Sequence, residues 1–197
     1  MRLILVRHGE TVENRKGIVQ GHTHGTLSKN GVKQARLVAK RLSDLKIDII
    51  FTSDLRRAKN TAKEIAKYHP ESKFVQDKRL RERAFGLYDG KHKDFVIEKV
   101  LQKKSFSYSP PKGESFEDVI KRVKSFYKEI LKNHAKKTVL VVAHGGILVF
   151  FTRLVLGKSL KASIQRSEFQ KNTAVTDLKI IGKGMVRTLC LNCDKHL

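Results

Sequence analysis

Short apolar runs that alternate with amphipathic segments constrain the fold of this 197-residue chain most strongly. Arg2–Val6, Ile47–Thr52 and Thr138–Ala143 have the length and composition of buried strands. After Ser28 and Ser53, both suited to cap a helix, apolar residues recur at spacings of three and four. Strands that alternate with helices predict an α/β three-layer sandwich, in which a mostly parallel central sheet carries helices on both faces.

The remaining segments complete this arrangement. The sequence predicts a short strand over 73–76, a helix near 94–102, a helix that begins with a capping box at Ser115, and a helix from Gly145 to near Gly157. The ranges 173–181 and 185–191 are typical of a closing hairpin. Residues 80–114 show little periodicity. We expect a single domain over 1–197, with an irregular insertion at about 80–114 on the ligand side.

The charge of the chain indicates the sign of its partner. Lys and Arg number 42 against 19 Asp and Glu, which gives a formal net charge of +23. Such a field attracts anions, but the excess is spread evenly and forms no basic arm, so a nucleic acid is disfavoured. The longest apolar stretch, 139–151, is interrupted by histidine and glycine, so no membrane span or export signal is expected. We expect a cytoplasmic protein, and the sequence predicts no oligomeric state.

Two groups of residues have the spacing of metal or redox sites. Cys190, Cys193 and His196 form a C-x-x-C motif with a third candidate ligand, but a second ligand pair is missing and the motif ends a strand instead of beginning a helix. His22 and His24 are spaced as a metal pair, although solvated loop residues are the favoured interpretation. The sequence therefore favours neither a metal nor a redox role here.

Two expected strands end in histidine followed by glycine, one at Arg7 and His8 and the other at His144. The carboxyl ends of parallel strands face the ligand crevice, so both histidines are expected in one pocket. A third strand end places Arg57 at the start of a helix, beside N–H groups that attract anions. Arginines bind phosphate oxygens and keep a neighbouring imidazole neutral. One such histidine alone could simply bond a carbonyl, but the set favours phosphoryl chemistry.

The same residues lie in a longer series of motifs. In chain order these are Leu5-Val-Arg-His-Gly-Glu-Thr11, Asn14, Gln20-Gly21, Leu27-Ser28 with Gly31 and Gln34-Ala35, Thr52-Ser-Asp-Leu-Arg-Arg-Ala58 with Thr61-Ala62, Leu80-Arg-Glu82 with Gly86 and Gly90, Gly113-Glu-Ser115, Val142-Ala-His-Gly-Gly146, Asn172-Thr-Ala-Val175, and Leu191-Asn192 with His196-Leu197. With them the chain resembles the histidine phosphatase superfamily, the phosphoglycerate mutase-like proteins. The resemblance covers nearly the whole chain in the right order.

The resemblance implies a role for each site residue. His8 is the expected nucleophile, which forms a phosphohistidine. Glu82 is the expected general acid and base, although the residues alone would favour a solvated loop carboxylate. No metal or cofactor is implied, so the reaction is expected to be metal-independent. The phosphoryl oxygens are expected to be held by Arg7, Arg57 and His144, and the pocket to be completed by Asn14, Gln20 and the backbones of Gly21 and Gly145.

The segments 80–90 and 109–115 are most similar to the fructose-2,6-bisphosphatase (TIGAR-type) group, on the phosphatase branch of the superfamily. The expected activity is that of a phosphomonoesterase for a small phosphorylated metabolite, for example fructose 2,6-bisphosphate. Extra charge that would suit a bisphosphate, or merely lie on a solvated surface, comes from Arg83, Lys91, Lys93 and Lys112. Within the family, the alternatives are a broad-specificity sugar or nucleotide phosphatase, an α-ribazole phosphatase and a cofactor-dependent phosphoglycerate mutase. From another class, the alternative is a catalytically weak protein that binds polyanions or nucleic acid.

Two features depart from the family pattern or leave it open. His24 and Thr26 stand where family members usually have an aspartate and a proline, which changes the stiffness of the loop. Arg56 and Arg57 are adjacent, and the register of the family motif assigns the phosphate contact to Arg57.

Overall fold

The computed structural model describes residues 1–100, 103, 105–160, 169–182 and 184–197. Its centre is a six-stranded sheet in the order β3-β2-β4-β1-β5-β6. The strands are β1 (Arg2–Arg7), β2 (Ile49–Thr52), β3 (Lys73–Gln76), β4 (Thr138–Ala143), β5 (Val175–Gly182) and β6 (Met185–Cys193). The first four in sheet order are parallel to one another, and β5 and β6 continue the sheet as the antiparallel hairpin that the sequence predicts. The expected mostly parallel α/β sheet is confirmed.

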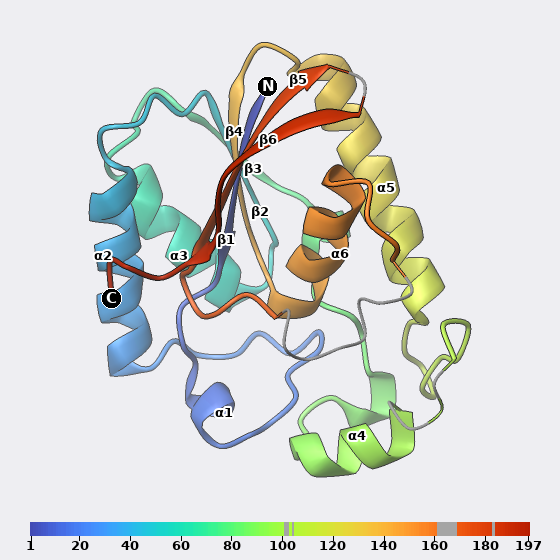
Figure 1. Ribbon diagram of the computed structural model, residues 1–197. Coiled ribbons are helices and arrows are strands. Elements are labelled where there is room, and N and C mark those ends of the chain that lie inside the picture. The colour runs from blue at the N-terminus through green and yellow to red at the C-terminus, as the bar shows by residue number, and fades with distance from the viewer. Residues whose placement is uncertain (101–102, 104, 161–168, 183) are drawn as a thin grey trace.

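Helices cover both faces of the sheet (Figure 1). One face packs against α2 (Lys29–Leu42) and α3 (Arg56–Ala66), and the other against α5 (Phe116–Asn133) and α6 (Gly145–Val155). Alternation along β1 explains the two cores, because Ile4 and Val6 point to the α2–α3 side, whereas Leu3 and Leu5 point to the α5–α6 side. All four side chains are fully buried, so the sheet forms the middle layer of a three-layer sandwich.

The helix starts show which capping predictions were right. Ser28 caps α2 through the N–H of Gly31, and Ser115 forms a capping box with Asp118 at the start of α5. The prediction for Ser53 was wrong: α3 begins at Arg56, with Leu55 at the capping position. The Ser53 hydroxyl accepts a hydrogen bond from the N–H of Leu55, so it closes the turn after β2 instead of reaching the first helical turn.

Residues 78–100 lie beyond the carboxyl ends of the parallel strands. They contain the short 3-10 helices Lys78–Leu80 and Gly86–Tyr88 and the helix α4 (Lys93–Val100). The helix expected near 94–102 is thus present, and its last two residues lie outside the described part of the chain. A further helical turn, α1 (Val12–Arg15), was not predicted; it begins at Thr11, which forms a capping box with Asn14. In Figure 1, α1 and α4 lie at the same end of the sheet.

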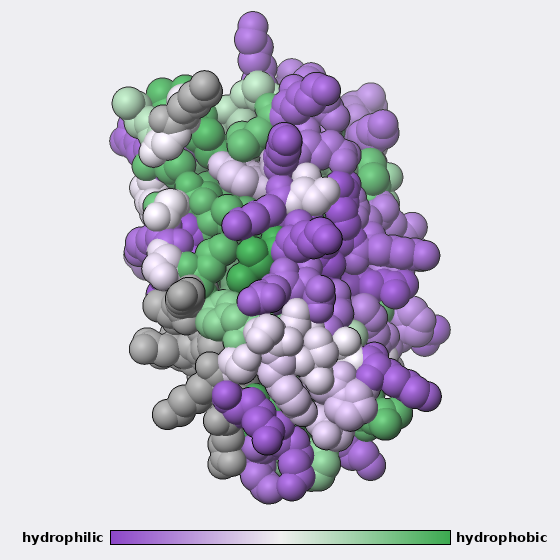
Figure 2. Space-filling model, turned by 90° about the vertical axis from the view of Figure 1, so that its right-hand side faces the viewer, coloured by the Kyte–Doolittle hydropathy of each residue, from purple (hydrophilic) through white to green (hydrophobic). Residues whose placement is uncertain are grey.

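Figure 2 shows the molecule from the side of α5 and α6, where a broad hydrophilic surface adjoins an apolar strip. An apolar groove also lies between α5, α6 and the β5–β6 hairpin, where Tyr127, Leu154 and Ile181 are among its lining residues. Within the described residues, no helix combines the length and the apolar character that crossing a membrane requires.

Candidate active site

His8 directly follows β1 and is almost fully buried. Its Nδ1 lies 2.8 Å from the carbonyl oxygen of Gly9. A carbonyl oxygen can only accept a hydrogen bond, so Nδ1 carries the proton and Nε2 keeps its lone pair. Burial lowers the pKa of His8 well below its ordinary value, and the positive charges of Arg57 and Arg7 lower it further. The ring is therefore held neutral, with Nε2 as a nucleophilic nitrogen.

His144 directly follows β4, the strand that pairs with β1 in parallel. The ring centroids of His144 and His8 are 5.2 Å apart, so the two strand ends do bring the histidines together. The Nε of Arg57 donates to Nδ1 of His144 over 3.2 Å, which leaves the proton of the neutral ring on Nε2. That Nε2 is buried and has no hydrogen-bond partner. Burial and the charge of Arg57 keep the pKa of His144 well below its ordinary range.

Arg57 joins three parts of the chain. Its guanidinium donates to His144 and to the carbonyl oxygens of Gly21 and Thr23, and its side chain is 1% exposed. Burial lowers its pKa to about 10, an effect that the Glu82 carboxylate opposes. Its neighbour Arg56 is exposed. The structure therefore directs Arg57, and not Arg56, toward the histidine pair.

Arg7 approaches the same space from the end of β1. Its Nη1 donates to the carbonyl oxygen of Gln170 over 2.8 Å, whereas its Nε is buried and has no partner. Burial lowers the pKa of Arg7 and the charge of Glu82 raises it. A Cβ atom added at Gly145 would lie 3.4 Å from the guanidinium, which is an ordinary contact, so the start of α6 lies against Arg7 without requiring a glycine there.

Unpartnered buried atoms mark this region as a ligand site. In the described part of the chain, five buried side-chain nitrogen or oxygen atoms lack a hydrogen-bond partner, and four of them are Arg7 Nε, His144 Nε2, Gln20 Oε1 and Arg83 Nη1. A buried polar atom without a partner is costly and in native proteins calls for an explanation. The donors on Arg7 and His144, next to the free Nε2 of His8, are suited to the oxygens of an anion such as a phosphoryl group.

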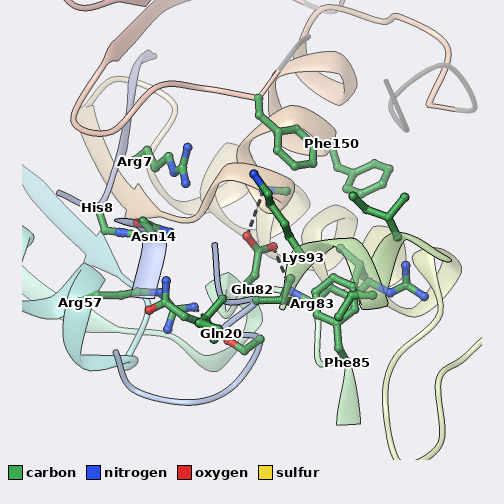
Figure 3. Close-up of a pocket in the computed structure, with 18 of the residues that line it drawn as sticks. Arg7, His8, Asn14, Gln20, Arg57, Glu82, Arg83, Phe85, Lys93 and Phe150 are labelled. Atoms are coloured by element: carbon green, nitrogen blue, oxygen red, sulfur yellow. Dashed lines mark hydrogen bonds between the residues drawn. The ribbon is translucent and has the colours of Figure 1, made fainter. Parts of the chain in front are cut away.

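Glu82 lies in the segment beyond the strand ends. Its two carboxylate oxygens accept from the backbone N–H of Gly146, over 3.1 Å, and from that of Arg83, over 3.0 Å. Figure 3 shows Glu82 between the charged group around His8 and the aromatic side chains of Phe85 and Phe150. A carboxylate in this place can exchange a proton with a group bound beside His8.

Asn14, Gln20 and Gly21 line the same cavity as His8. Asn14 accepts from the N–H of Thr11 through Oδ1, which leaves its Nδ2 as a donor. Gln20 donates to the hydroxyl of Thr11 over 2.9 Å. Gly21 has a φ of +46°, and a Cβ atom there would lie 1.7 Å from a carboxylate oxygen of Asp89. Only glycine fits, because the loop must pass this carboxylate in a left-handed conformation.

The cavity has a volume of about 210 Å³ and two unlike ends. Its inner end holds Arg7, His8, Arg57 and Glu82, which are charged or polar. The outer end is largely apolar and is lined by Ile18, Val19, Phe85, Val96, Ile97, Phe116, Phe150 and Phe169. Such a site binds a charged group at its base and an organic portion at its mouth.

The structure alters several expectations about the surrounding charges. His22 is half-buried and not a solvated loop residue, because its Nε2 donates to the carbonyl oxygen of Glu82 over 2.9 Å. Arg83 lines the cavity but is 3% exposed, and its guanidinium donates to the backbone carbonyls of Tyr108 and Glu114. It also lies 4.0 Å from the ring centroid of Phe116. Lys91 and Lys112 are exposed and are not among the lining residues, whereas Lys93 is one of them.

Other residues that support the site were not predicted. Arg122, on α5, donates to the carbonyl oxygens of Arg79, Arg81 and Glu82, and so holds the segment that carries the Glu82 carboxylate. Asn172 donates to the carbonyl oxygen of His8 over 2.9 Å. The motif Asn172-Thr-Ala-Val175 was a usable signal for the contact between Asn172 and His8. The position of Arg122 on a charged helix face gave no signal for its contacts with the segment that carries Glu82.

The structure groups no metal ligands around the candidate residues that it describes. Among the residues that the structure describes, no three His, Cys, Asp or Glu side chains are grouped so that they could hold a metal ion. His24 is exposed, and its carbonyl oxygen accepts from the backbone N–H of Arg57.

The chain matches a family model described as Histidine phosphatase superfamily (branch 1) over residues 3–193. It is 37% identical over 177 residues to a metal-independent phosphoserine phosphatase of Arabidopsis thaliana, and this alignment covers 82% of this chain and 74% of the relative. It is 39% identical over 138 residues to the fructose-2,6-bisphosphatase TIGAR of Xenopus tropicalis, and this alignment covers 66% of this chain and 50% of the relative. A similarity to a TIGAR-type protein is therefore found, but at about the same identity it covers less of both chains than the similarity to the phosphoserine phosphatase.

Solved structures agree with these sequence comparisons. A mycobacterial glucosyl-3-phosphoglycerate phosphatase in complex with VO3 superimposes with a TM-score of 0.86 and 25% sequence identity. The alignment covers 98% of this chain and 99% of that one.

Proposed function

This chain belongs to the histidine phosphatase superfamily, as its motifs predict, and is a phosphatase; from that premise we propose that it hydrolyses phosphate monoesters of small metabolites through a phosphohistidine on His8. One observation carries the proposal. The hydrogen bond from Nδ1 of His8 to Gly9 leaves a buried, neutral Nε2 beside the unpartnered donors of Arg7 and His144. This arrangement supports His8 as the nucleophile and Arg7 and His144 as donors to the phosphoryl oxygens.

In the first step, Nε2 of His8 attacks phosphorus and the bond from phosphorus to the ester oxygen breaks. Arg7, Arg57 and the Nε2–H of His144 stabilise the negative charge on the phosphoryl oxygens, which phosphoryl transfer requires more than covalent assistance. Glu82, in its protonated form, gives its proton to the departing alcohol. The products of this step are the free alcohol and a phosphohistidine.

In the second step, the Glu82 carboxylate takes a proton from water while the water oxygen attacks phosphorus. The bond between phosphorus and Nε2 of His8 breaks, inorganic phosphate leaves, and His8 returns to its neutral form. Gly146 and Arg83 hold the carboxylate through their backbone N–H groups in both steps. The positive charge that the reaction needs comes from Arg57, which is buried, and Arg7, which is partly buried, and this supports a metal-independent mechanism.

The cavity supports a substrate with one phosphoryl group and a compact organic portion. Apolar side chains form most of the outer lining, and Lys93 is its exposed cation. A second phosphate, as in fructose 2,6-bisphosphate, would meet Lys93 as the exposed cation, because Arg83 is buried, its Nε and Nη2 donate to backbone carbonyls, and only its Nη1 is without a partner. We therefore place a monophosphate that carries one further anionic group, as phosphoserine does, ahead of the sugar bisphosphate.

The first experiment measures phosphate release in EDTA from phosphoserine, fructose 2,6-bisphosphate, 3-phosphoglycerate and p-nitrophenyl phosphate. We expect release by the wild type, an acid-labile phosphate on His8 in quenched samples, and the loss of both in His8→Ala. Release that survives in His8→Ala would overturn the proposed nucleophile. Conversion of 3-phosphoglycerate to its isomer would instead support a mutase. Intact substrates, together with salt-sensitive retention on DNA, would support polyanion binding.

A second experiment tests the role of Glu82. The variant Glu82→Gln keeps the shape of the side chain but cannot donate and accept the proton in turn. We expect kcat on phosphoserine to fall by about 10²–10⁴-fold. The loss should be smaller on p-nitrophenyl phosphate, whose leaving group departs without a proton. Glu117→Gln, an exposed glutamate on α5, is the matched control. Equal losses on both substrates would show that Glu82 is not the general acid.

A further inference from the structure

A second group of reactive side chains lies where β6 ends, apart from the cavity that contains His8. It consists of Cys190, Cys193 and His196, together with Arg41 from the last turn of α2. Nη2 of Arg41 lies 3.2 Å from Sγ of Cys193 and 4.0 Å from Sγ of Cys190. Nη1 of the same guanidinium donates to the carbonyl oxygen of Cys193 and contacts His196 Nδ1.

The backbone between the two cysteines explains how both reach one guanidinium. In a regular strand, residues three apart point to opposite faces of the sheet. Asn192 has a φ of +46°, however, and the register of β6 against β5 shifts at this point. This irregularity reverses the alternation and turns both sulfurs toward Nη2 of Arg41. Two thiols that would otherwise be separated by the sheet therefore both contact one guanidinium nitrogen.

The two thiols differ in their surroundings. Burial raises the pKa of Cys190, whose Sγ donates to the carbonyl oxygen of Val175. The backbone N–H of Lys195 and the guanidinium of Arg41 lower the pKa of Cys193. Both side chains are partly exposed. Cys193 therefore ionises more readily than Cys190, which is the division between an attacking and a resolving cysteine.

A zinc site is a poor fit for the same residues. The guanidinium of Arg41 lies among the two sulfurs and His196, where a metal ion would have to be, and like charges repel. The C-x-x-C motif thus has the geometry of a thiol pair and not that of a ligand set.

We propose that Cys193 and Cys190 form a peroxide-sensitive modification site, which is oxidised reversibly to an intramolecular disulfide. The Cys193 thiolate attacks an oxygen of a hydroperoxide, the O–O bond breaks, and a sulfenic acid forms with release of hydroxide. Cys190 then attacks the Cys193 sulfur, the S–O bond breaks, and the proton of the Cys190 thiol leaves in water. The thiolate and the thiol lose two electrons in total, and hydrogen peroxide is reduced to one hydroxide ion and one molecule of water. The proposal is independent of the phosphatase activity.

The first test treats the reduced, native wild-type protein with stoichiometric hydrogen peroxide and measures its mass and its free thiols. We expect a monomer that is lighter by two hydrogens, in which neither cysteine reacts with iodoacetamide until dithiothreitol is added. Free thiols that persist, or a disulfide between two chains, would overturn the proposal. Cys190→Ser should trap a sulfenic acid on Cys193 that dimedone labels, and the absence of this adduct would contradict the assigned order.

The second test measures how fast iodoacetamide alkylates each cysteine in native protein at pH 7. Only the thiolate reacts with iodoacetamide, so Cys193 should react several-fold faster than Cys190. Arg41→Gln should slow Cys193 several-fold, whereas Lys40→Gln, which removes a charge from the exposed face of the same helix, should not. If iodoacetamide alkylates the two cysteines of the native wild type at equal rates, and these rates match those in urea, the proposed difference in reactivity between Cys193 and Cys190 is refuted.

Discussion

Replacing Gly146 by alanine should test the position of Glu82 without changing its chemistry. Gly146 lies in the first turn of α6, and its N–H donates to one oxygen of the Glu82 carboxylate over 3.1 Å. A Cβ atom at this position would lie 2.6 Å from the other carboxylate oxygen and 3.3 Å from Cδ. An ordinary contact needs 3.4 Å or more, so the carboxylate has to move by roughly 0.8 Å.

The size of the effect follows from this displacement. Misplacement of a reacting group by about 1 Å can cost about 10²-fold in rate, and a complete general acid contributes about 10²–10⁴-fold. We therefore expect kcat of Gly146→Ala on phosphoserine to fall by about 10–100-fold, less than in Glu82→Gln. Alanine is favoured over glycine inside a helix by about 1 kcal/mol, so the melting temperature should not fall.

Steady-state kinetics on phosphoserine and p-nitrophenyl phosphate, with a thermal melt of each variant, would check this prediction. Gly182→Ala is the matched control, because a Cβ atom there meets no other atom within 4 Å. An unchanged kcat in Gly146→Ala would refute the reasoning, since the carboxylate would then not need its present place. A lower melting temperature with equal losses on both substrates would point to a general disturbance of the site.

Three further predictions follow from the site. His144→Ala removes a donor to the phosphoryl oxygens, so kcat in steady-state assays should fall by about 10²–10³-fold; a change confined to KM would contradict this role. The lowered pKa values mean that His8 and His144 are neutral in the folded protein. Their contribution to stability is therefore complete above pH 6.5, the ordinary pKa that they have in the unfolded chain. It is lost as the pH falls from 6.5 through the lowered pKa values of the folded protein. Urea denaturation should show a loss of up to about 1.4 kcal/mol per pH unit for each histidine below pH 6.5, with a smaller slope in His8→Gln; parallel slopes would refute it. Lys93→Met should raise KM for phosphoserine by about two- to fivefold, because an exposed ion pair is worth at most about 1 kcal/mol, and should leave KM for p-nitrophenyl phosphate unchanged. The control is Lys91→Met, at another exposed lysine. Equal effects of the two substitutions would show that Lys93 does not bind the second anionic group.

Local sequence patterns predicted most of the scaffold because they reflect local physics. The run Thr138–Ala143 is apolar throughout and forms a strand buried on both faces, with the expected boundaries. Ser115 and Asp118 cap α5 through contacts within one helical turn. The prediction that Ser53 caps a helix was wrong, because a serine after a strand can close a turn as readily as it can cap a helix. The turn α1 is too short to leave a periodic signal.

The inner part of the site was predictable and its supports were not. His8 and His144 end neighbouring parallel strands, and the order of the elements is enough to bring them together. The contacts of Arg122 with the backbone at Glu82 join residues about 40 positions apart, and no local period encodes them. Arg83 was expected as extra charge at the pocket, but it lies buried against Phe116, a stacking that only the tertiary structure reveals.

The residues around His8 come from nearly every part of the chain. Arg57 follows β2, Glu82 lies beyond β3, His144 follows β4, and the carbonyl of Gln170 that holds Arg7 precedes β5. Contacts between residues so far apart in sequence form late when a chain folds, since long loops must close first. A refolding chain should therefore regain helical signal before it regains activity. Turnover is then a reporter of the last assembly step, and no fragment that lacks either end of the chain should carry the reaction.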